Sequence, residues 1–500
     1  MMRPLFLSLL LASAAAQAAE GLALRDAIAL GLQRSPDIQL QRYAEGASAG
    51  ARKSSEAAFD TVLTASAGQN RDLRPLRADE RARFLAAGVD QDLNVNSYSL
   101  GASRQLENGY VLTGAYALTS TRDDVQQAQN IPRQNVDKLS FGLRLPLQKN
   151  AGREALAVRN ATGLEYQASL RDTEQVVART VLAVVQAYWD WASRQASAQV
   201  ALGAEQRVRQ LQRETEKLVA ADELPPAELN LMQAAVKERE TARIGAEQKA
   251  RDGRFALARL FGMDAVATEA LPLPAEILPE QAGASLLESL RQQALERRAD
   301  LQALRLREQA AQERLAGARL ATRPTVDLEL GAYYAGLKEG TRANPAAFDP
   351  TARTAGPGLS AKLSFSLPMA NAATEGPLLT ALANADSARL RREALEQSIL
   401  ANVEAAYGNL RAVEAQLASS AVSVERYRAA LRDTVTKRQL GTATLIDVLN
   451  VEDRLNNAIQ GRLAYQLAYV QARATILYET GRLLKPEGQG FTVALEQLLP

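Results

Sequence analysis

The stretch RQLGTATLIDVLNVEDRLNNA, residues 438–458, decides how the second half of the chain folds. A glycine and several small residues lead into an amphipathic run, which is typical of a turn followed by a helix. Gly441 supplies the permissive turn conformation, and Thr442 or Thr444 can cap the helix. Asp447 then lies in the first turns of that helix. The stretch therefore predicts a turn between two helices, with an acidic residue beside it.

A very long helix precedes this turn, and another occurs in the first half of the chain. Residues 152–219 and 375–440 carry helical patterns rich in Ala, Arg, Glu and Gln. At 1.5 Å per residue, about 65 residues form a rod of roughly 100 Å, whereas helices of globular domains have about 11 or 12 residues. Each rod ends at a turn and returns as a shorter helix. Pro225 and Pro226 can occupy the start of the first return helix, where a missing N–H costs little.

The two halves of the chain repeat one plan. ALGLQRSPDIQL (29–40) aligns without gaps with QQALERRADLQA (292–303). Further along the chain the two halves align at a second constant offset in residue number, at which Glu228 of the first half corresponds to Asp447 of the second. The shared order of such matches indicates an internal two-fold repeat.

Between the helices the pattern of apolar residues changes to a period of two, which predicts β-strands. Four such segments lie within residues 60–147 and two within residues 325–368. Glu107-Asn108-Gly109 predicts the turn of a hairpin that only the first half has. We interpret this hairpin as additional barrel strands and keep an extracellular flap as the alternative.

The predicted fold is mixed, mainly α-helical with β-strands. Its parts are a signal peptide (1–18), a first repeat (19–262), a linker (263–284), a second repeat (285–483) and a C-terminal tail (484–500). Each repeat begins with a helix. In the first repeat we expect strands at about 60–147, a long helix at about 152–219 and a return helix at about 226–262. In the second we expect strands at about 325–368, a long helix at about 375–440 and a return helix at about 442–483.

The first residues, MMRPLFLSLLLASAAAQAAE, are typical of a secretory signal. Arg3 gives the positive start, Leu5 to Leu11 form a short apolar stretch, and Ala16-Gln17-Ala18 fits a cleavage site. No later segment reaches about 18 consecutive apolar residues, so the pattern predicts no membrane-spanning helix.

The composition excludes several classes of function. Lys and Arg number 59 and Asp and Glu 57, so no nucleic-acid-binding surface is expected. The chain has neither His nor Cys, which excludes thiol nucleophiles, imidazole triads and metal sites built on these residues. Nothing in the sequence brings two carboxylates into a defined pocket. We therefore expect no enzyme activity, no catalytic residues, no cofactor and no metal site.

The strands are too few to close a barrel within one chain. Open sheet edges are not tolerated in lipid, because their N–H and C=O groups would lack partners. Strands from several protomers could complete one barrel, and the long helices could complete one tube.

The sequence resembles the TolC-like outer-membrane efflux proteins, nearly end to end, through this duplicated plan. The sharpest similarity is GTATLIDVLNVEDRLNNA, which is similar to the family's turn-and-helix signature. The resemblance implies a homotrimer with a β-barrel in the lipid of the Gram-negative outer membrane, continued by a long α-helical barrel in the periplasm. It also implies passive export, with a periplasmic adaptor and an inner-membrane efflux pump or ABC transporter as partners.

The same resemblance implies a periplasmic gate where the long helices turn back. It places Asp447 and Glu228 on the acidic positions that line the narrowed pore, where an acidic ring would repel anions. The family's best-studied member has Arg where this chain has Ala443, Tyr where it has Arg438, and a second acid where it has Asn450. Our hypothesis is that Arg438 replaces the missing cation and pairs with Glu228 or another acid near the turn. The plainer alternative is that both acids only complement the helix dipole.

Two other functions remain open at the level of sequence. One is an exit duct for type I protein secretion, which would differ mainly in its partners. The other is an exported coiled-coil structural protein without a pore, which would explain the long helices but not the duplicated strands.

Overall fold

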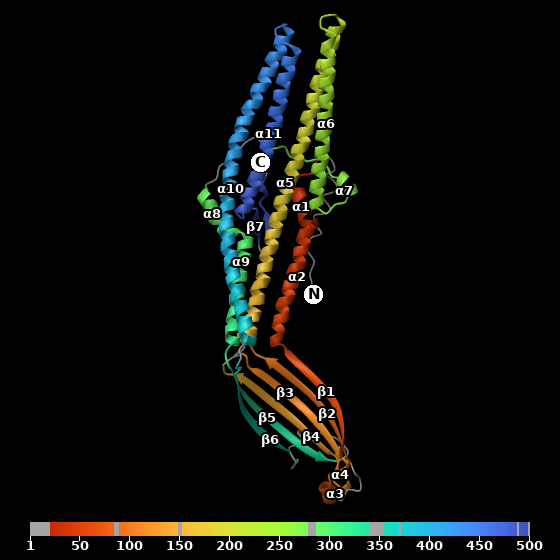
Figure 1. Ribbon diagram of the computed structural model, residues 1–500, viewed down its shortest axis with the longest axis vertical. Coiled ribbons are helices and arrows are strands. Elements are labelled where there is room, and N and C mark those ends of the chain that lie inside the picture. The colour runs from red at the N-terminus through yellow and green to blue at the C-terminus, as the bar shows by residue number, and fades with distance from the viewer. Residues whose placement is uncertain are drawn as a thin grey trace. The chain divides into compact units, whose positions relative to one another are not determined.

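The computed structural model describes most of the chain (Figure 1). The described residues are 21–84, 90–148, 153–278, 287–340, 355–367, 369, 372–487 and 490–498. The predicted signal peptide and part of the predicted linker lie outside them. The chain divides into two compact units. The first unit comprises the described residues of Met1–Gly46, Ser169–Leu304 and Arg392–Pro500, and the second those of Ala47–Ala168 and Arg305–Arg391.

The described chain is mainly helical. Its helices are α1 (Leu24–Arg34), α2 (Pro36–Glu56), α3 (Ala78–Phe84), α4 (Asp124–Ala128), α5 (Arg153–Ala220), α6 (Pro226–Leu260), α7 (Ala265–Glu269), α8 (Leu287–Arg297), α9 (Ala299–Ala321), α10 (Ala372–Gln439), α11 (Leu445–Glu479) and α12 (Leu495–Leu498). Its strands are β1 (Thr61–Pro75), β2 (Asp90–Gln105), β3 (Val111–Asp123), β4 (Gln134–Pro146), β5 (Thr325–Glu339), β6 (Ala355–Ser366), β7 (Leu484–Glu487) and β8 (Gly490–Val493). No helix within these described segments combines the length and the apolar character needed to cross a membrane.

The helices show the internal repeat that the sequence predicts. Helices α5 and α10 each have 68 residues, and α6 and α11 each have 35. The starts of both pairs are separated by the same offset that aligns Glu228 with Asp447. Helices α1 and α8 have 11 residues each, and their starts keep the offset of the first alignment. The two halves therefore form equivalent helical hairpins from different residues.

Strands β1 to β6 form one antiparallel sheet, in sequence order. The additional hairpin of the first half, β2 and β3, lies inside this sheet, in agreement with its interpretation as added strands. Its turn contains Gly109, whose φ of +84° is an angle that glycine adopts without strain. The outer strands β1 and β6 each leave one edge without a partner strand in the described sheet.

The register of the sheet separates an apolar face from a polar one. One row across the six strands is Leu63, Ala102, Gly114, Phe141, Ala332 and Leu359. The adjacent row is Val62, Ser103, Thr113, Gly142, Gly331 and Ser360. Because adjacent residues of a strand point to opposite sides, the first row lies on one face and the second on the other. Large side chains of the apolar face are strongly exposed, with Leu63 at 75% and Leu359 at 87%.

The strands are longer than the alternating segments predict. Strand β1 continues through the mostly polar residues after Gly68 to Pro75, and these pair with residues 90–96 of β2. The apolar alternation fades there, but the ladder hydrogen bonds persist. Arg71 adds an exposed ion pair with Asp92 at 2.7 Å. A pattern of apolar residues cannot show strand extensions that are held by polar cross-strand pairs.

The main hydrophobic core lies in the first unit, among α1, α5, α6, α8, α10 and α11. Its largest side chains are those of Trp189, Trp191 and Tyr188, each with at most 1% of its surface exposed. The Tyr188 hydroxyl lies 2.8 Å from the carbonyl oxygen of Leu22 and also contacts the Glu276 carboxylate. Burial raises the pKa of this hydroxyl. Tyr188 therefore joins the first described residues to the linker in the middle of the chain.

Candidate functional site at the turns of the long helices

The turns between α5 and α6 and between α10 and α11 follow the same backbone path. Each contains one residue with positive φ, which is Asp222 at +59° in the first turn and Gly441 at +75° in the second. In both turns the next residue donates its backbone N–H to a carbonyl oxygen five residues earlier, at 2.9 Å. The bonds run from Glu223 to Leu218 and from Thr442 to Lys437. This is a common way to end a helix, and glycine suits it best because the left-handed region penalises a Cβ atom. Thr442 strengthens the second turn, since its hydroxyl donates to the carbonyl of Lys437 at 3.0 Å.

The second return helix begins with a capping box. Thr444, not Thr442, is its N-cap, and the Thr444 hydroxyl accepts from the backbone N–H of Asp447 at 3.2 Å. In return, Oδ2 of Asp447 accepts from the backbone N–H of Thr444 at 2.8 Å and from its hydroxyl at 2.7 Å. The hydrogen bond from the Thr444 hydroxyl, and to a lesser degree that from its backbone N–H, holds the pKa of Asp447 below its usual value. Asp447 is therefore an exposed, ionised carboxylate fixed in place by the start of α11.

The first return helix begins differently. Pro225 is its N-cap and supplies no side-chain hydrogen bond, while Pro226 takes the first helical position. Glu228 occupies the position equivalent to Asp447, but its side chain is half-buried. Its Oε2 atom is buried without a hydrogen-bond partner in the described chain. An acceptor of this kind favours a cationic or hydrogen-bonding partner from outside the single chain.

The predicted partner of Glu228 is not in contact with it within one chain. Arg438 is half-buried in the last turn of α10, and no ion pair of its side chain occurs among the described residues. Asn450 is exposed on α11, one turn beyond Asp447. The pairing of Arg438 with an acid near the turn, and the pore-lining role of these residues, stay predictions.

The structure adds two ion pairs that the sequence reading missed. Glu452 of α11 is 2% exposed, and its Oε1 lies 2.7 Å from Nε of Arg207 in α5. The neighbouring Asp453 pairs with Arg239 of α6. Both bonds join the second helical hairpin to the first, a short distance beyond the turns. Glu452 follows Leu445 and other buried residues at helical spacing. The sequence therefore could have indicated that this carboxylate is buried, because it stands at a core position of the helix.

A small hydrophobic cluster supports these ion pairs. It consists of Val208 from α5, Met232 and Val236 from α6, and Leu445 from α11. Beside it, the buried carboxylate of Glu205 accepts from Nε of Arg243 at 2.6 Å, which joins α5 to α6. The start of α11 is therefore held by apolar packing and by the ion pairs of Glu452 and Asp453 together.

The charged residues described at this site do not form a metal-binding cluster. No group of three or more acidic side chains lies close enough there to hold a metal ion. What the geometry offers is a set of charges fixed at the ends of helices.

Part of the chain matches the model of a known family. Residues 290–482 match the model of the family described as outer membrane efflux protein. A search of characterised protein sequences gave no significant match.

The solved structures similar to this chain include outer-membrane proteins and channels from several bacteria. VceC of Vibrio cholerae is 18% identical, with 92% of this chain and 96% of that one covered and a TM-score of 0.66. CmeC of Campylobacter jejuni is 13% identical, with coverages of 92% and 85% and a TM-score of 0.67. MtrE of Neisseria gonorrhoeae, in its open state, is 16% identical, with coverages of 92% and 89% and a TM-score of 0.62.

The fold of the chain is thus that of the outer-membrane channels. Identities this low show a shared fold alone, and the family match comes from the second half of the chain. The family match and the shared fold together confirm the resemblance to the TolC-like outer-membrane efflux proteins.

Proposed function

We propose that the chain is one protomer of a homotrimeric channel in the outer membrane of a Gram-negative bacterium. The observation that carries the proposal is the six-stranded sheet, which has an exposed apolar face, a polar face and two edges that no strand of the described chain pairs with. Pairing β6 of one copy with β1 of the next would satisfy both edges, and three copies would close one barrel. The apolar rows would then face lipid and the polar rows a water-filled lumen.

The long helices would continue this barrel as a tube through the periplasm. In this proposal the channel conducts passively, and energy comes from an inner-membrane efflux pump or ABC transporter that acts through a periplasmic adaptor. Support for these partners comes from the family match in residues 290–482. Affinity capture from cross-linked membranes, followed by identification of the bound adaptor, tests that part of the proposal.

The turns of the long helices would form the narrow end of the tube. There Asp447 would line the pore as one acidic charge per protomer, with Glu228, Arg438 and Asn450 close by. The buried, unpartnered oxygen of Glu228 supports a pairing with Arg438 of the same or the neighbouring protomer. The pairs of Glu452 and Asp453 with α5 and α6 would hold the second hairpin in the closed position.

Conductance in planar bilayers tests the proposal. We expect the purified protein to insert as a channel with a low resting conductance, and Arg438→Ala to raise that conductance. Arg251→Ala, on an exposed position of α6, is the matched control and should leave it unchanged. Protein that folds with full helix content but never conducts would contradict the channel. An unchanged conductance in Arg438→Ala would contradict only the role given to Arg438.

A further inference from the structure

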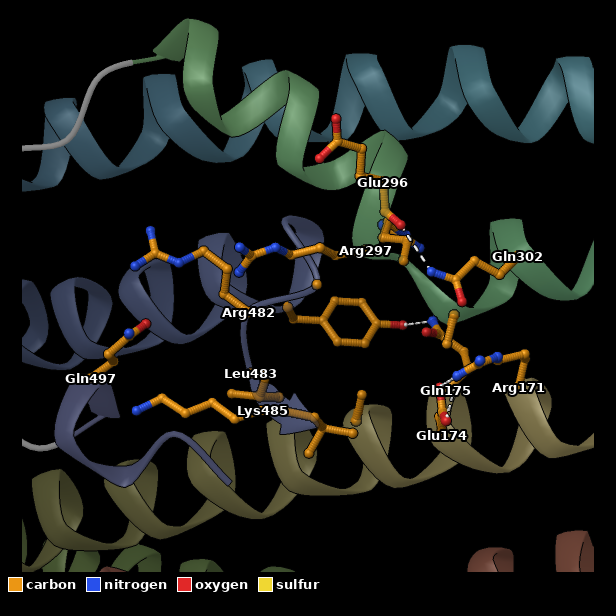
Figure 2. Close-up of a pocket in the computed structure, with 16 residues that line it drawn as sticks. Arg171, Glu174, Gln175, Glu296, Arg297, Gln302, Arg482, Leu483, Lys485 and Gln497 are labelled. Atoms are coloured by element: carbon orange, nitrogen blue, oxygen red, sulfur yellow. Dashed lines mark hydrogen bonds and ion pairs between the residues drawn. The ribbon is translucent and has the colours of Figure 1, made fainter. Parts of the chain in front are cut away.

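A second feature of the first unit involves none of the residues given to the gate. It is a pocket of about 470 Å³ between α5, the junction of α8 with α9, and the segment that follows α11 (Figure 2). Cavities of this size hold small organic ligands. One wall contains the ring of Tyr478, whose hydroxyl accepts from Nε2 of Gln175 at 2.8 Å. Leu483 and Leu484 add apolar surface.

The lining of this pocket carries excess positive charge. It contains five cations, which are Arg171, Arg297, Arg298, Arg482 and Lys485, against the two carboxylates of Glu174 and Glu296. Two of the cations are neutralised. Arg171 pairs with Glu174 at 2.7 Å, and the buried Arg298 pairs with Asp300 at 2.6 Å and with Glu479.

The other three cations form what we call the basic end of the pocket, made of Arg297, Arg482 and Lys485. Figure 2 shows them extending toward the side of the pocket on which Gln497 lies. No ion pair of Arg297 or Arg482 occurs in the described chain, and Lys485 has only an exposed contact of 3.5 Å with Glu496. Arg297 and Arg482 lack a counter-charge in the described chain and that of Lys485 is exposed, so the basic end favours an anion.

The one remaining carboxylate does not serve as that anion. Oε1 of Glu296 accepts from Nε2 of Gln292 at 3.0 Å. Figure 2 shows the Glu296 carboxylate turned away from the basic end. The Gln497 side chain adds an amide oxygen that is buried without a hydrogen-bond partner in the described chain. The pocket therefore offers donors for an anion and a free acceptor beside them.

The internal repeat shows that the fold does not require these charges. At the offset that aligns the two return helices, Arg482 corresponds to Met263 and Lys485 to Val266. At the offset that aligns α1 with α8, Arg298 corresponds to Ser35. The equivalent helices have the same lengths, so uncharged residues serve equally well at these positions in the first repeat. Arg482 and Lys485 therefore have no charged equivalent in the first repeat, whereas Arg297 corresponds to Arg34.

We propose that this pocket binds a small organic oxyanion, with a carboxylate or phosphate group at the basic end and an apolar part against Tyr478. Arginine suits such a group, because its planar fork donates two parallel hydrogen bonds to one carboxylate or phosphate. The proposal is tested without ion conduction, since its residues are not those given to the gate.

Calorimetric titration of the full chain in detergent tests the proposal, at a fixed ionic strength because salt screens such contacts. The probes are phenyl phosphate, phenylacetate and the neutral 2-phenylethanol. We expect saturable binding of at least one anion, at one per chain, and none of the neutral alcohol. Arg482→Met should weaken this binding about tenfold, the loss expected for one charge-assisted hydrogen bond.

The choice of methionine guards against misfolding, because Met263 fills the equivalent position of the first repeat. Arg251→Met on an exposed face of α6 is the control and should bind like the wild type. Tighter binding of phenyl phosphate would identify a phosphate ligand, and tighter binding of phenylacetate a carboxylate ligand. The proposal is overturned if neither anion binds saturably, or if a folded Arg482→Met variant binds as tightly as the wild type.

Discussion

The buried ion pair of Glu452 with Arg207 predicts how firmly α11 is held against the first hairpin. Removing the cation with Arg207→Met would leave the carboxylate, 2% exposed, without its partner. Breaking a fully buried pair from one side costs about 3–5 kcal/mol. Because the Arg207 side chain is 43% exposed, water can reach the pair from that side. We therefore expect a smaller cost, of about 2–3 kcal/mol.

Hydrogen exchange of the first turns of α11, followed by mass spectrometry, measures this cost locally. A loss of about 2–3 kcal/mol corresponds to exchange that is about 30 to 160 times faster. The amides near the start of α10 should exchange as in the wild type, because they lie in the other compact unit. Lys237→Met, which removes an exposed pair with Glu240, is the control and should change exchange very little.

A double variant separates the charge from the packing. Combining Arg207→Met with Glu452→Leu replaces the pair by two apolar side chains, and such replacements are often neutral or stabilising. We expect exchange in the double variant to return close to the wild-type rate. Additive losses in the double variant, or unchanged exchange in Arg207→Met, would refute the reasoning that this pair fastens α11.

Three further predictions concern the turn and the sheet. Gly441→Ala should lower the free energy of unfolding by about 1–2 kcal/mol, because the φ of +75° at residue 441 disfavours a Cβ atom. Asp222→Gly should be tolerated, and thermal unfolding measures both variants. Thr444→Ala should cost about 1 kcal/mol by removing the N-cap of α11, and Thr444→Ser should restore most of it; equal melting temperatures of the two variants would contradict this. Phe141→Lys on the apolar face should impair folding into lipid vesicles by about 2–4 kcal/mol, whereas Thr113→Lys on the polar face should not; equal yields of the two would show that the faces are assigned wrongly.

The elements that the sequence could predict are those that depend on local patterns. The long helices follow from continuous helical periodicity, and Gly441 indicates the turn because few other residues adopt its conformation. The strands follow from alternation, although their polar extensions do not. The internal repeat could be found because matching positions keep a constant offset along the chain.

The contacts that the sequence could not predict depend on which helix faces meet. Thr442 and Thr444 were equal candidates for the N-cap, and only the backbone path of the turn selects Thr444. The partner of Glu452 comes from a helix in the other half of the chain. The basic end of the pocket forms because the chain after α11 returns to the start of α9, which no local pattern of Arg482 shows.

Cross-linking between the open edges of the sheet tests most directly the claim that separate chains close one barrel. The chain has no cysteine, so cysteines introduced at Ser66 in β1 and Ser360 in β6 would be the only thiols. Within one chain these strands are separated by five strand spacings, about 24 Å, which a short bis-maleimide cannot span. We predict covalent dimers and trimers in the outer membrane, and none when both cysteines lie in the interior strands β3 and β4. Exclusively monomeric product from the β1–β6 pair, in folded protein, would contradict the account.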